Sequence, residues 1–307
     1  MDIRMELSRY LDYCLYRKEL DAKTVKAYQI DLRQFADAAQ DNPTDRGVIE
    51  DYITSLHRHY RQKTVKRKTA SLRAFYSYLE DAEILTDNPF RRIRTAFRED
   101  AVLPRIVARK DIEAILNEIY GRLQESTPAG RKRLLRDIAV LEVLFGTGAR
   151  VSEVSMITPD SIDLDTGTIR FDGKGGRERC VQIGEEKVVS VLWDYYEQNT
   201  QAIRDCGYFF VNRSGRRFRE QSIRDMLKKH AKAAGVERRV TPHQFRHAVA
   251  TYLIEEGVDI SYVRQILGHS SLRTTQIYLH VATEKQAEVL RLKHPRRKMN
   301  INDRKNF

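Results

Sequence analysis

One short segment, 166–183, limits the fold of this chain more than any other feature. It places the runs TIRFD and RERCVQI on either side of GKGG, a pattern typical of two strands joined by a tight turn. Most of the remaining chain has helical periodicity, and the apolar run YFFV at 208–211 predicts one further short strand. The sequence therefore predicts a mainly α fold with a small antiparallel β-sheet, of the α+β class.

The 307 residues suffice for two domains, and the helical pattern divides accordingly. Residues 1–88 fit four helices and predict a helical N-terminal domain. The stretch 89–105 is rich in arginine and has little periodicity, which is typical of a basic linker. Residues 106–297 predict a second domain, and 298–307 a flexible basic tail. In the second domain we expect helices at about 109–123, 134–145, 185–199, 220–234, 242–256 and 260–267.

Two of the N-terminal helices have distinct apolar faces. In 21–39 that face is marked by Val25, Tyr28, Ile30, Leu32 and Phe35. The helix expected at 62–81 combines an apolar run with basic residues. These basic residues lack acidic partners four positions away, so they are unlike a solvent-exposed face stabilised by ion pairs within the helix. Contact with phosphate groups is the stronger interpretation. The candidate contacts in this helix and the linker are Lys63, Lys66, Arg67, Lys68, Arg91 and Arg92.

The charge of the chain points to a polyanionic partner. It has 55 Lys and Arg against 43 Asp and Glu, a net charge of +12 with a pI near 9.6, which fits DNA, RNA or an acidic membrane. No apolar run approaches the ~20 residues that cross a bilayer, and the N-terminus differs from a signal peptide, so we expect a soluble cytoplasmic protein. Cys14, Cys180 and Cys206 lack metal or disulfide spacing, and we expect reduced packing residues.

The segment TPHQFRH has the composition of a helix start with an anion site. Thr241 suits the N-cap, Pro242 the first helical position and Gln244 the third, which together form a capping box. His243 and Arg246 then share a helix face near the positive end of the dipole, where donors stabilise an anion such as phosphate.

Two competing interpretations fail on residue identity and spacing. His247 follows His243 by four residues, as in a zinc motif, but a glutamine stands where the catalytic Glu belongs and Arg246 would place a cation beside the metal. We expect His247 to pack within its helix and no metal to bind. The segment GTIRFDGKGG differs from a phosphate-binding loop in its glycine spacing, and Gly175 replaces the magnesium-binding Ser or Thr, so we expect no nucleotide cofactor.

Four further residues complete a set of groups suited to a phosphodiester. Arg150 follows a glycine-rich segment at an expected helix end in FGTGARVSEV, and Lys174 lies in the expected hairpin turn. In DISYVRQILGHSSLRTTQIYLHV a helix stops at Gly268, His269 follows it, and Tyr278 lies nine residues further on.

The chain resembles the tyrosine recombinase family of DNA-cutting enzymes in the order, spacing and local sequence of Arg150, Lys174, His243, Arg246, His269 and Tyr278. The motifs GTGARVSEV, TPHQFRHAVATYLIEEGVDI, ILGHSSLRTTQIYLHV and HPRRK are similar to the Xer-type branch of that family. The similarity is close over about 107–297. The N-terminal helices are similar to the family's core-binding domain, which binds DNA, in length and character.

This resemblance implies that Tyr278 attacks DNA to form a 3′-phosphotyrosyl bond, with His243 accepting its proton and Lys174 protonating the leaving 5′ oxygen. The remaining groups would support the phosphate. Arg150 and Arg246 would bind its non-bridging oxygens, His269 would add a hydrogen bond, and Glu153 would orient a neighbouring base.

The resemblance also implies a partner, double-stranded DNA of the nucleoid, and an assembly. Four subunits would close on two DNA sites, all of this chain or shared with a related recombinase, without cofactor or metal. A type IB topoisomerase shares the chemistry. A non-catalytic DNA-binding protein is the alternative from another class, and it would tolerate loss of a catalytic side chain, whereas none is missing here. Chromosome dimer resolution and integration or excision of a mobile element both fit.

Overall fold

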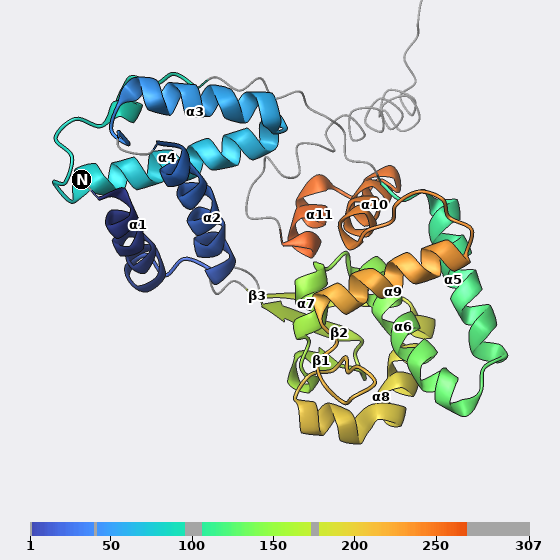
Figure 1. Cartoon of the computed structure of the whole chain (residues 1–307). Helices are drawn as coiled ribbons and strands as arrows, with labels where there is room; N and C mark the ends of the chain where they lie inside the picture. Colours follow the sequence, from blue (N-terminus) through green and yellow to red (C-terminus); the bar gives the residue numbers. More distant parts are fainter. Residues whose placement is uncertain (1, 40–41, 96–105, 173–177, 269–307) are drawn as a thin grey trace, which may run out of the picture. The chain divides into compact units, whose positions relative to one another are not determined.

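The computed structural model of the chain describes residues 2–39, 42–95, 106–172 and 178–268. It divides into two units, Met1–Asp100 and Ala101–Phe307 (Figure 1), and each is described by itself. The expected tail at 298–307 lies outside the described residues.

The N-terminal unit is helical, as expected. Asp2 begins its first helix by accepting hydrogen bonds from the backbone N–H groups of Arg4 and Met5, and Asp45 begins the third by accepting one from Val48. The elements of this unit are α1 (Ile3–Asp12), the π-helical turn η1 (Tyr13–Arg17), α2 (Ala22–Ala39), α3 (Arg46–His59), α4 (Gln62–Asp81) and the 3₁₀ turn η2 (Pro89–Arg91).

The core of this unit includes a cluster of aromatic side chains. Phe35 from α2 and both Phe75 and Tyr76 from α4 are fully buried, where α4 packs against α2 and α3. The apolar face expected for α2 is wrong at Ile30, which is 55% exposed. The buried Leu32 lies two positions further along, and this spacing places the two side chains roughly 200° apart around the helix.

The first part of the expected linker belongs to the N-terminal core instead. Asn88 caps η2 by accepting a hydrogen bond from the backbone N–H of Phe90 at 2.9 Å. Phe90 and Ile93 are both buried in the hydrophobic core of this unit, where Phe90 contacts the Tyr76 ring. Residues 89–93 are therefore held by hydrophobic packing, and the stretch 96–105 lies outside the described residues.

One of the basic residues expected to contact phosphate is buried. The Lys68 ammonium donates to Asp31 Oδ1 at 3.0 Å and to Gln34 Oε1 at 2.5 Å, and its side chain is 5% exposed. Arg67 also pairs with Asp31, and the Ser71 hydroxyl donates to it at 3.0 Å. The acidic partner comes from α2 rather than from a position four residues away. Lys68 therefore holds α4 to α2, which corrects the expected phosphate contact.

We expect Asp31→Ala to lower the free energy of unfolding of this unit by about 3–5 kcal/mol, because it leaves the Lys68 charge buried without its partner. Asp37→Ala is the matched control, since the Arg4–Asp37 ion pair is largely exposed and such pairs contribute roughly 0–1 kcal/mol. Urea-dependent hydrogen exchange of α2 and α4 peptides, measured on the full chain, reports both values. Equal effects of the two substitutions would contradict the assigned role of Asp31.

The second unit is also mainly helical. Its elements are α5 (Arg109–Gln124), α6 (Pro128–Thr147), α7 (Val151–Met156), the 3₁₀ turn η3 (Pro159–Ser161), β1 (Ile162–Asp163), β2 (Thr168–Asp172), β3 (Glu178–Gln182), α8 (Glu186–Cys206), α9 (Glu220–Ala233), α10 (Pro242–Glu255) and α11 (Ile260–Leu267). Helix α6 begins earlier than expected because Thr127 caps it, accepting from the backbone N–H of Gly130, with Pro128 in the first turn.

The small sheet confirms the expected antiparallel arrangement. β2 pairs with β3 in register Ile169↔Val181, and β1 adds a third strand that the sequence pattern did not indicate. The strand expected at 208–211 is wrong: the segment makes a single bridge, Val211↔Arg217. Its apolar side chains fill the core, and the Tyr195 hydroxyl bonds to the backbone of 209 and 211 in place of a neighbouring strand.

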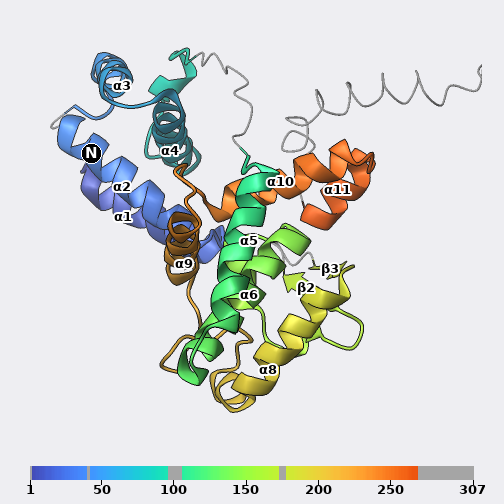
Figure 2. The same cartoon turned by 90° about the vertical axis from the view of Figure 1, so that its right-hand side faces the viewer.

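Helix α6 is the centre of the second unit. Its side chains from Ile138 to Leu141 are fully buried, and α5, α8 and α10 pack around it. Figure 2 shows α5 and α6 running side by side. This central helix ends at the residues that precede Arg150, so the core fixes the position of that arginine.

Candidate active site

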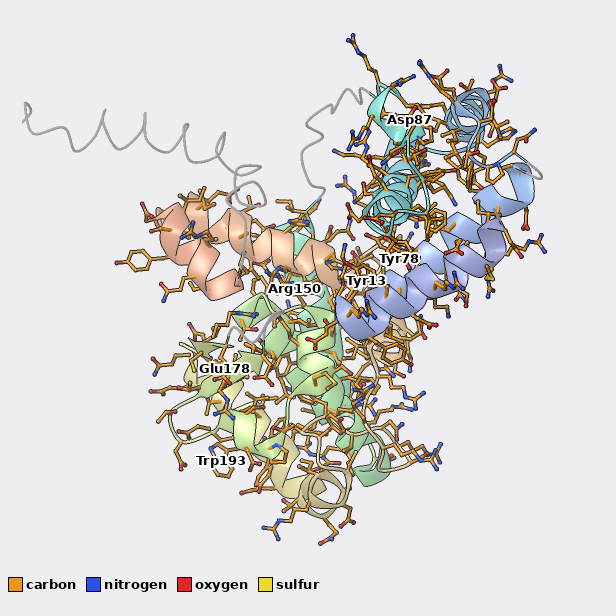
Figure 3. All side chains as sticks on the ribbon, turned by 90° about the vertical axis from the view of Figure 1, so that its left-hand side faces the viewer. Tyr13, Tyr78, Asp87, Arg150, Glu178 and Trp193 are labelled. Carbon is orange, nitrogen blue, oxygen red and sulfur yellow. The ribbon has the colours of Figure 1, made fainter. Side chains whose placement is uncertain are left out.

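Arg150 lies at the junction between two helices. It is the N-cap of α7, and its backbone N–H donates to Glu153 Oε2 at 2.7 Å. Its side chain is 37% exposed, with one nitrogen donating to Glu153 Oε1 at 2.7 Å and the other to the Gly268 carbonyl at 3.3 Å. Figure 3 shows Arg150 where the green helices meet the orange α10 and α11. The guanidinium is thus anchored on one side and accessible on another.

Arg246 is buried beside the same helix end. Its two terminal nitrogens donate to the carbonyls of Gly148 at 2.8 Å and Leu267 at 2.5 Å. These carbonyls close α6 and α11, where the negative end of a helix dipole favours a cation. Arg150 and Arg246, which are far apart in sequence, therefore converge on the carboxyl end of α11.

Two glycines allow this convergence. Gly148 and Gly268 end α6 and α11 with φ of +60° and +64°, in the left-handed region that favours glycine. A Cβ atom on Gly148 would lie 2.6 Å from Leu267 Cδ2. Any larger residue there would displace the buried side chain of Leu267.

The helix start predicted at Thr241 is confirmed. Thr241 Oγ1 accepts from the Gln244 backbone N–H at 3.3 Å and bonds to its side-chain amide oxygen at 3.0 Å. His243 is exposed in the first turn of α10, three residues before Arg246. His247 is half-buried, and burial, followed by the charges of His243 and Arg246, lowers its pKa and favours the neutral ring.

Glu153 is held between two arginines. Its side chain is 7% exposed and receives both terminal nitrogens of Arg179, at 2.9 and 2.7 Å, in addition to the bonds from Arg150. Burial alone would raise the pKa of Glu153, but the hydrogen bonds from Arg179 and Arg150 outweigh it and hold the pKa at about 2. The carboxylate is therefore ionised at neutral pH and orients two guanidiniums, whereas the sequence suggested that it orients a base.

Sequence reasoning missed Arg179, although its strand contained a signal. Arg179 occupies the same face of β3 as the buried Val181, where an apolar residue is normal. An arginine at a core-facing strand position needs a buried acidic partner, and Glu153 supplies it.

Three of the expected site residues, Lys174, His269 and Tyr278, lie outside the described residues. Among the described residues, no group of His, Cys, Asp and Glu side chains is placed to hold a metal ion. No helix in the same part of the chain is long and apolar enough to cross a membrane.

Comparison with known proteins identifies the family of the chain. The phage integrase family matches residues 107–285, and the phage integrase N-terminal SAM-like domain matches residues 7–83. Since the first match alone covers more than half of the chain, the chain belongs to the phage integrase family and is a site-specific tyrosine recombinase.

Its relatives place it near the Xer-type recombinases. It is 41% identical over 300 residues to a tyrosine recombinase of Agathobacter rectalis, covering 96% of this chain and 98% of that protein. It is 33% identical over 299 residues to tyrosine recombinase XerD of Listeria innocua, covering 94% and 97%. A solved lambda integrase tetramer bound to a Holliday junction has a similar fold, with a TM-score of 0.69 and 15% identity over 91% of this chain and 77% of that one.

Proposed function

We propose that Tyr278 cleaves one strand of duplex DNA while Arg150 and Arg246 hold the scissile phosphate. The phenolic oxygen forms a bond to phosphorus as the bond to the 5′ oxygen breaks, which gives a 3′-phosphotyrosyl bond and a free 5′ hydroxyl. Attack by a 5′ hydroxyl from the partner strand reverses these steps and rejoins the DNA. The phosphodiester energy is retained, so the reaction needs no nucleotide.

The convergence of Arg150 and Arg246 on the end of α11 is the observation that most supports this proposal. A guanidinium has five N–H donors in a rigid fork, so backbone carbonyls can anchor it while it binds a phosphoryl oxygen. Arg150 and Arg246 neutralise the charge on the non-bridging oxygens. Loss of one such donor typically raises the activation barrier by ~3–4 kcal/mol.

Two of the remaining residues, His243 and Lys174, carry out the proton transfers. A tyrosine with a pKa of about 10 is only ~0.1% ionised at neutral pH, so Tyr278 loses its proton during the attack. His243 is exposed near Arg246 and accepts that proton. Lys174 donates a proton to the leaving 5′ oxygen, and His269, which follows Gly268 in the sequence, adds a hydrogen bond to the phosphate. These roles of Lys174, His269 and Tyr278 rest on the sequence match with the family.

The working assembly is a tetramer on two DNA sites in the nucleoid, within the cytoplasm. The solved lambda integrase tetramer, which has this fold, supports four subunits. All four are copies of this chain, or some are copies of a related recombinase. Dimer resolution and mobile-element integration or excision use the same strand exchange.

A covalent adduct separates this proposal from simple DNA binding. The substrate is a duplex selected from a randomised DNA pool by binding to the full-length chain, hereafter the selected duplex, with a nick that prevents religation. We expect a protein–DNA band that persists on a denaturing gel without added metal or ATP. Binding without any such band would contradict strand cleavage.

The N-terminal unit presents basic side chains suited to the DNA backbone. Lys63 and Lys66 are exposed at the start of α4. Arg91 and Arg92 pair with Glu80 and Asp87, but their side chains are about 70% exposed, and such ion pairs contribute little free energy. These arginines can therefore exchange a carboxylate for a phosphate at small cost. Arg67 is half-exposed and forms an ion pair with Asp31, so we expect it to bind phosphate more weakly than the other four residues.

We expect replacement of Lys63, Lys66, Arg91 and Arg92 by alanine to flatten the dependence of log affinity on log salt, because fewer counterions are released when the protein binds DNA. The slope should fall by about 0.9 for each phosphate that the variant no longer neutralises. Filter binding of the selected duplex over a range of salt concentrations measures this slope. The control removes two exposed charges on α8, at Lys187 and Arg204, and the change in slope is compared per removed charge. An unchanged slope in the first variant, or equal flattening per removed charge in the control, would contradict the assigned DNA-binding residues.

A further inference from the structure

Arg179 joins three elements around the candidate active site. From β3 it donates to the Ile266 carbonyl in α11 at 2.9 Å, and to both oxygens of Glu153 in α7. Its guanidinium lies over the Phe171 ring, 4.8 Å from the centroid. A Cβ atom on Gly268 would lie 2.9 Å from Arg179 Cδ, so the two residues are in close contact.

The charges of this cluster depend on Arg179. Glu153 carries one negative charge, and it bonds to Arg150 and Arg179, which carry one positive charge each. The three side chains together have a net charge of +1. Without Arg179, a buried carboxylate would pair with Arg150 alone, and the net charge of the pair would be zero.

We propose that Arg179 is a positioning residue whose charge balances Glu153 and so leaves Arg150 able to bind the scissile phosphate. The inference rests on the proposed function of Arg150. Arg179 itself does not bind the DNA. It acts through Glu153, and it also holds the end of α11, to which both Arg150 and Arg246 donate hydrogen bonds.

The physical reason is competition for one guanidinium. A carboxylate and a phosphate bind arginine in the same bidentate manner, and the interaction strengthens where water is excluded. Glu153 is nearly buried, so its attraction for Arg150 is weakly screened by solvent. The fork of Arg179 occupies both carboxylate oxygens and weakens that attraction.

Arg179→Gln removes the charge and keeps a hydrogen-bonding side chain. We expect it to slow formation of the covalent adduct by about 10²-fold, comparable to loss of one phosphate donor, while the affinity for the selected duplex stays within a few-fold. Arg179→Lys keeps the charge and should cleave at least ~10-fold faster than Arg179→Gln.

Adding Glu153→Gln to Arg179→Gln restores a net charge of +1 by removing the competing carboxylate. We expect the double variant to cleave at least ~10-fold faster than Arg179→Gln alone. A role as a structural brace predicts the opposite, because the double variant loses more hydrogen bonds than the single one. The double variant also removes both members of a buried ion pair, which proteins often tolerate.

The test measures adduct formation with the nicked selected duplex, together with duplex affinity and thermal unfolding. The inference would be overturned if folded Arg179→Gln cleaved at the wild-type rate, or if the Gln and Lys variants cleaved at equal rates. It would also be overturned if the double variant cleaved no faster than Arg179→Gln. If Arg179→Gln does not fold, the cleavage rate of the double variant provides the test. A rate within ~10-fold of wild type supports the proposal that Arg179 balances the charge of Glu153. A loss beyond ~10²-fold overturns that proposal. Absence of an adduct with the wild-type chain would instead refute the proposed function.

Discussion

Tyr278→Phe should abolish the covalent adduct with the nicked selected duplex while leaving affinity for that duplex unchanged. The substitution removes the phenolic oxygen and retains the ring, so packing is preserved but no atom remains to attack phosphorus. We expect this to be the largest effect of any single substitution. Denaturing gels report the adduct, and native gels report binding.

Tyr262→Phe is the matched control. Tyr262 is 63% exposed on α11, sixteen positions earlier in the sequence, and the same oxygen is removed. We expect wild-type adduct formation from it. Persistent adduct in Tyr278→Phe would mean that another residue is the nucleophile.

Lys174→Ala and Arg150→Ala should respond differently to sulfur in the leaving group. If Lys174 protonates the 5′ oxygen, its loss slows cleavage by roughly 10²–10⁴-fold on ordinary DNA. A thiolate leaves without a proton, so a 5′-bridging phosphorothiolate should largely restore the rate of this variant. Single-turnover cleavage of the two substrates measures the rescue.

Arg150→Ala is expected to stay slow on both substrates, by about 10²–10³-fold, because the non-bridging oxygens that it neutralises are unchanged by the sulfur. Equal rescue of the two variants would remove the assignment of Lys174 as the general acid. No rescue of Lys174→Ala would indicate that this lysine only positions DNA.

Local signals predicted the parts of the fold that are determined locally. The start of α10 at Thr241 and Pro242 and the end of α11 at Gly268 follow from capping preferences, which act within one helical turn. The hairpin pairing of β2 and β3 follows from alternation around a glycine-rich turn.

The errors concern residues whose environment depends on distant parts of the chain. Lys68 is buried because Asp31, 37 positions earlier, meets it across two helices. The run at 208–211 looks like a strand because it is apolar, but it is buried by packing around Tyr195. Burial and strand pairing leave the same apolar pattern in a short run, so the sequence does not separate them.

In the candidate site, too, residues that are close in sequence were predicted and residues that the fold brings together were not. His243 and Arg246 were found together because a single helix turn relates them. Arg179 was missed because its partners, Glu153 and Ile266, come from two other elements that the fold brings to β3. The similarity to a family supplied Lys174, His269 and Tyr278, which spacing alone would not have distinguished from ordinary polar residues.

Mass spectrometry of the trapped adduct identifies the residue that attacks the DNA. After nuclease and trypsin digestion of the wild-type complex, we expect one modified peptide, TTQIYLHVATEK, with a nucleotide attached through its 3′ phosphate to Tyr278. A nucleotide on any other residue, or attached through a 5′ phosphate, would contradict it.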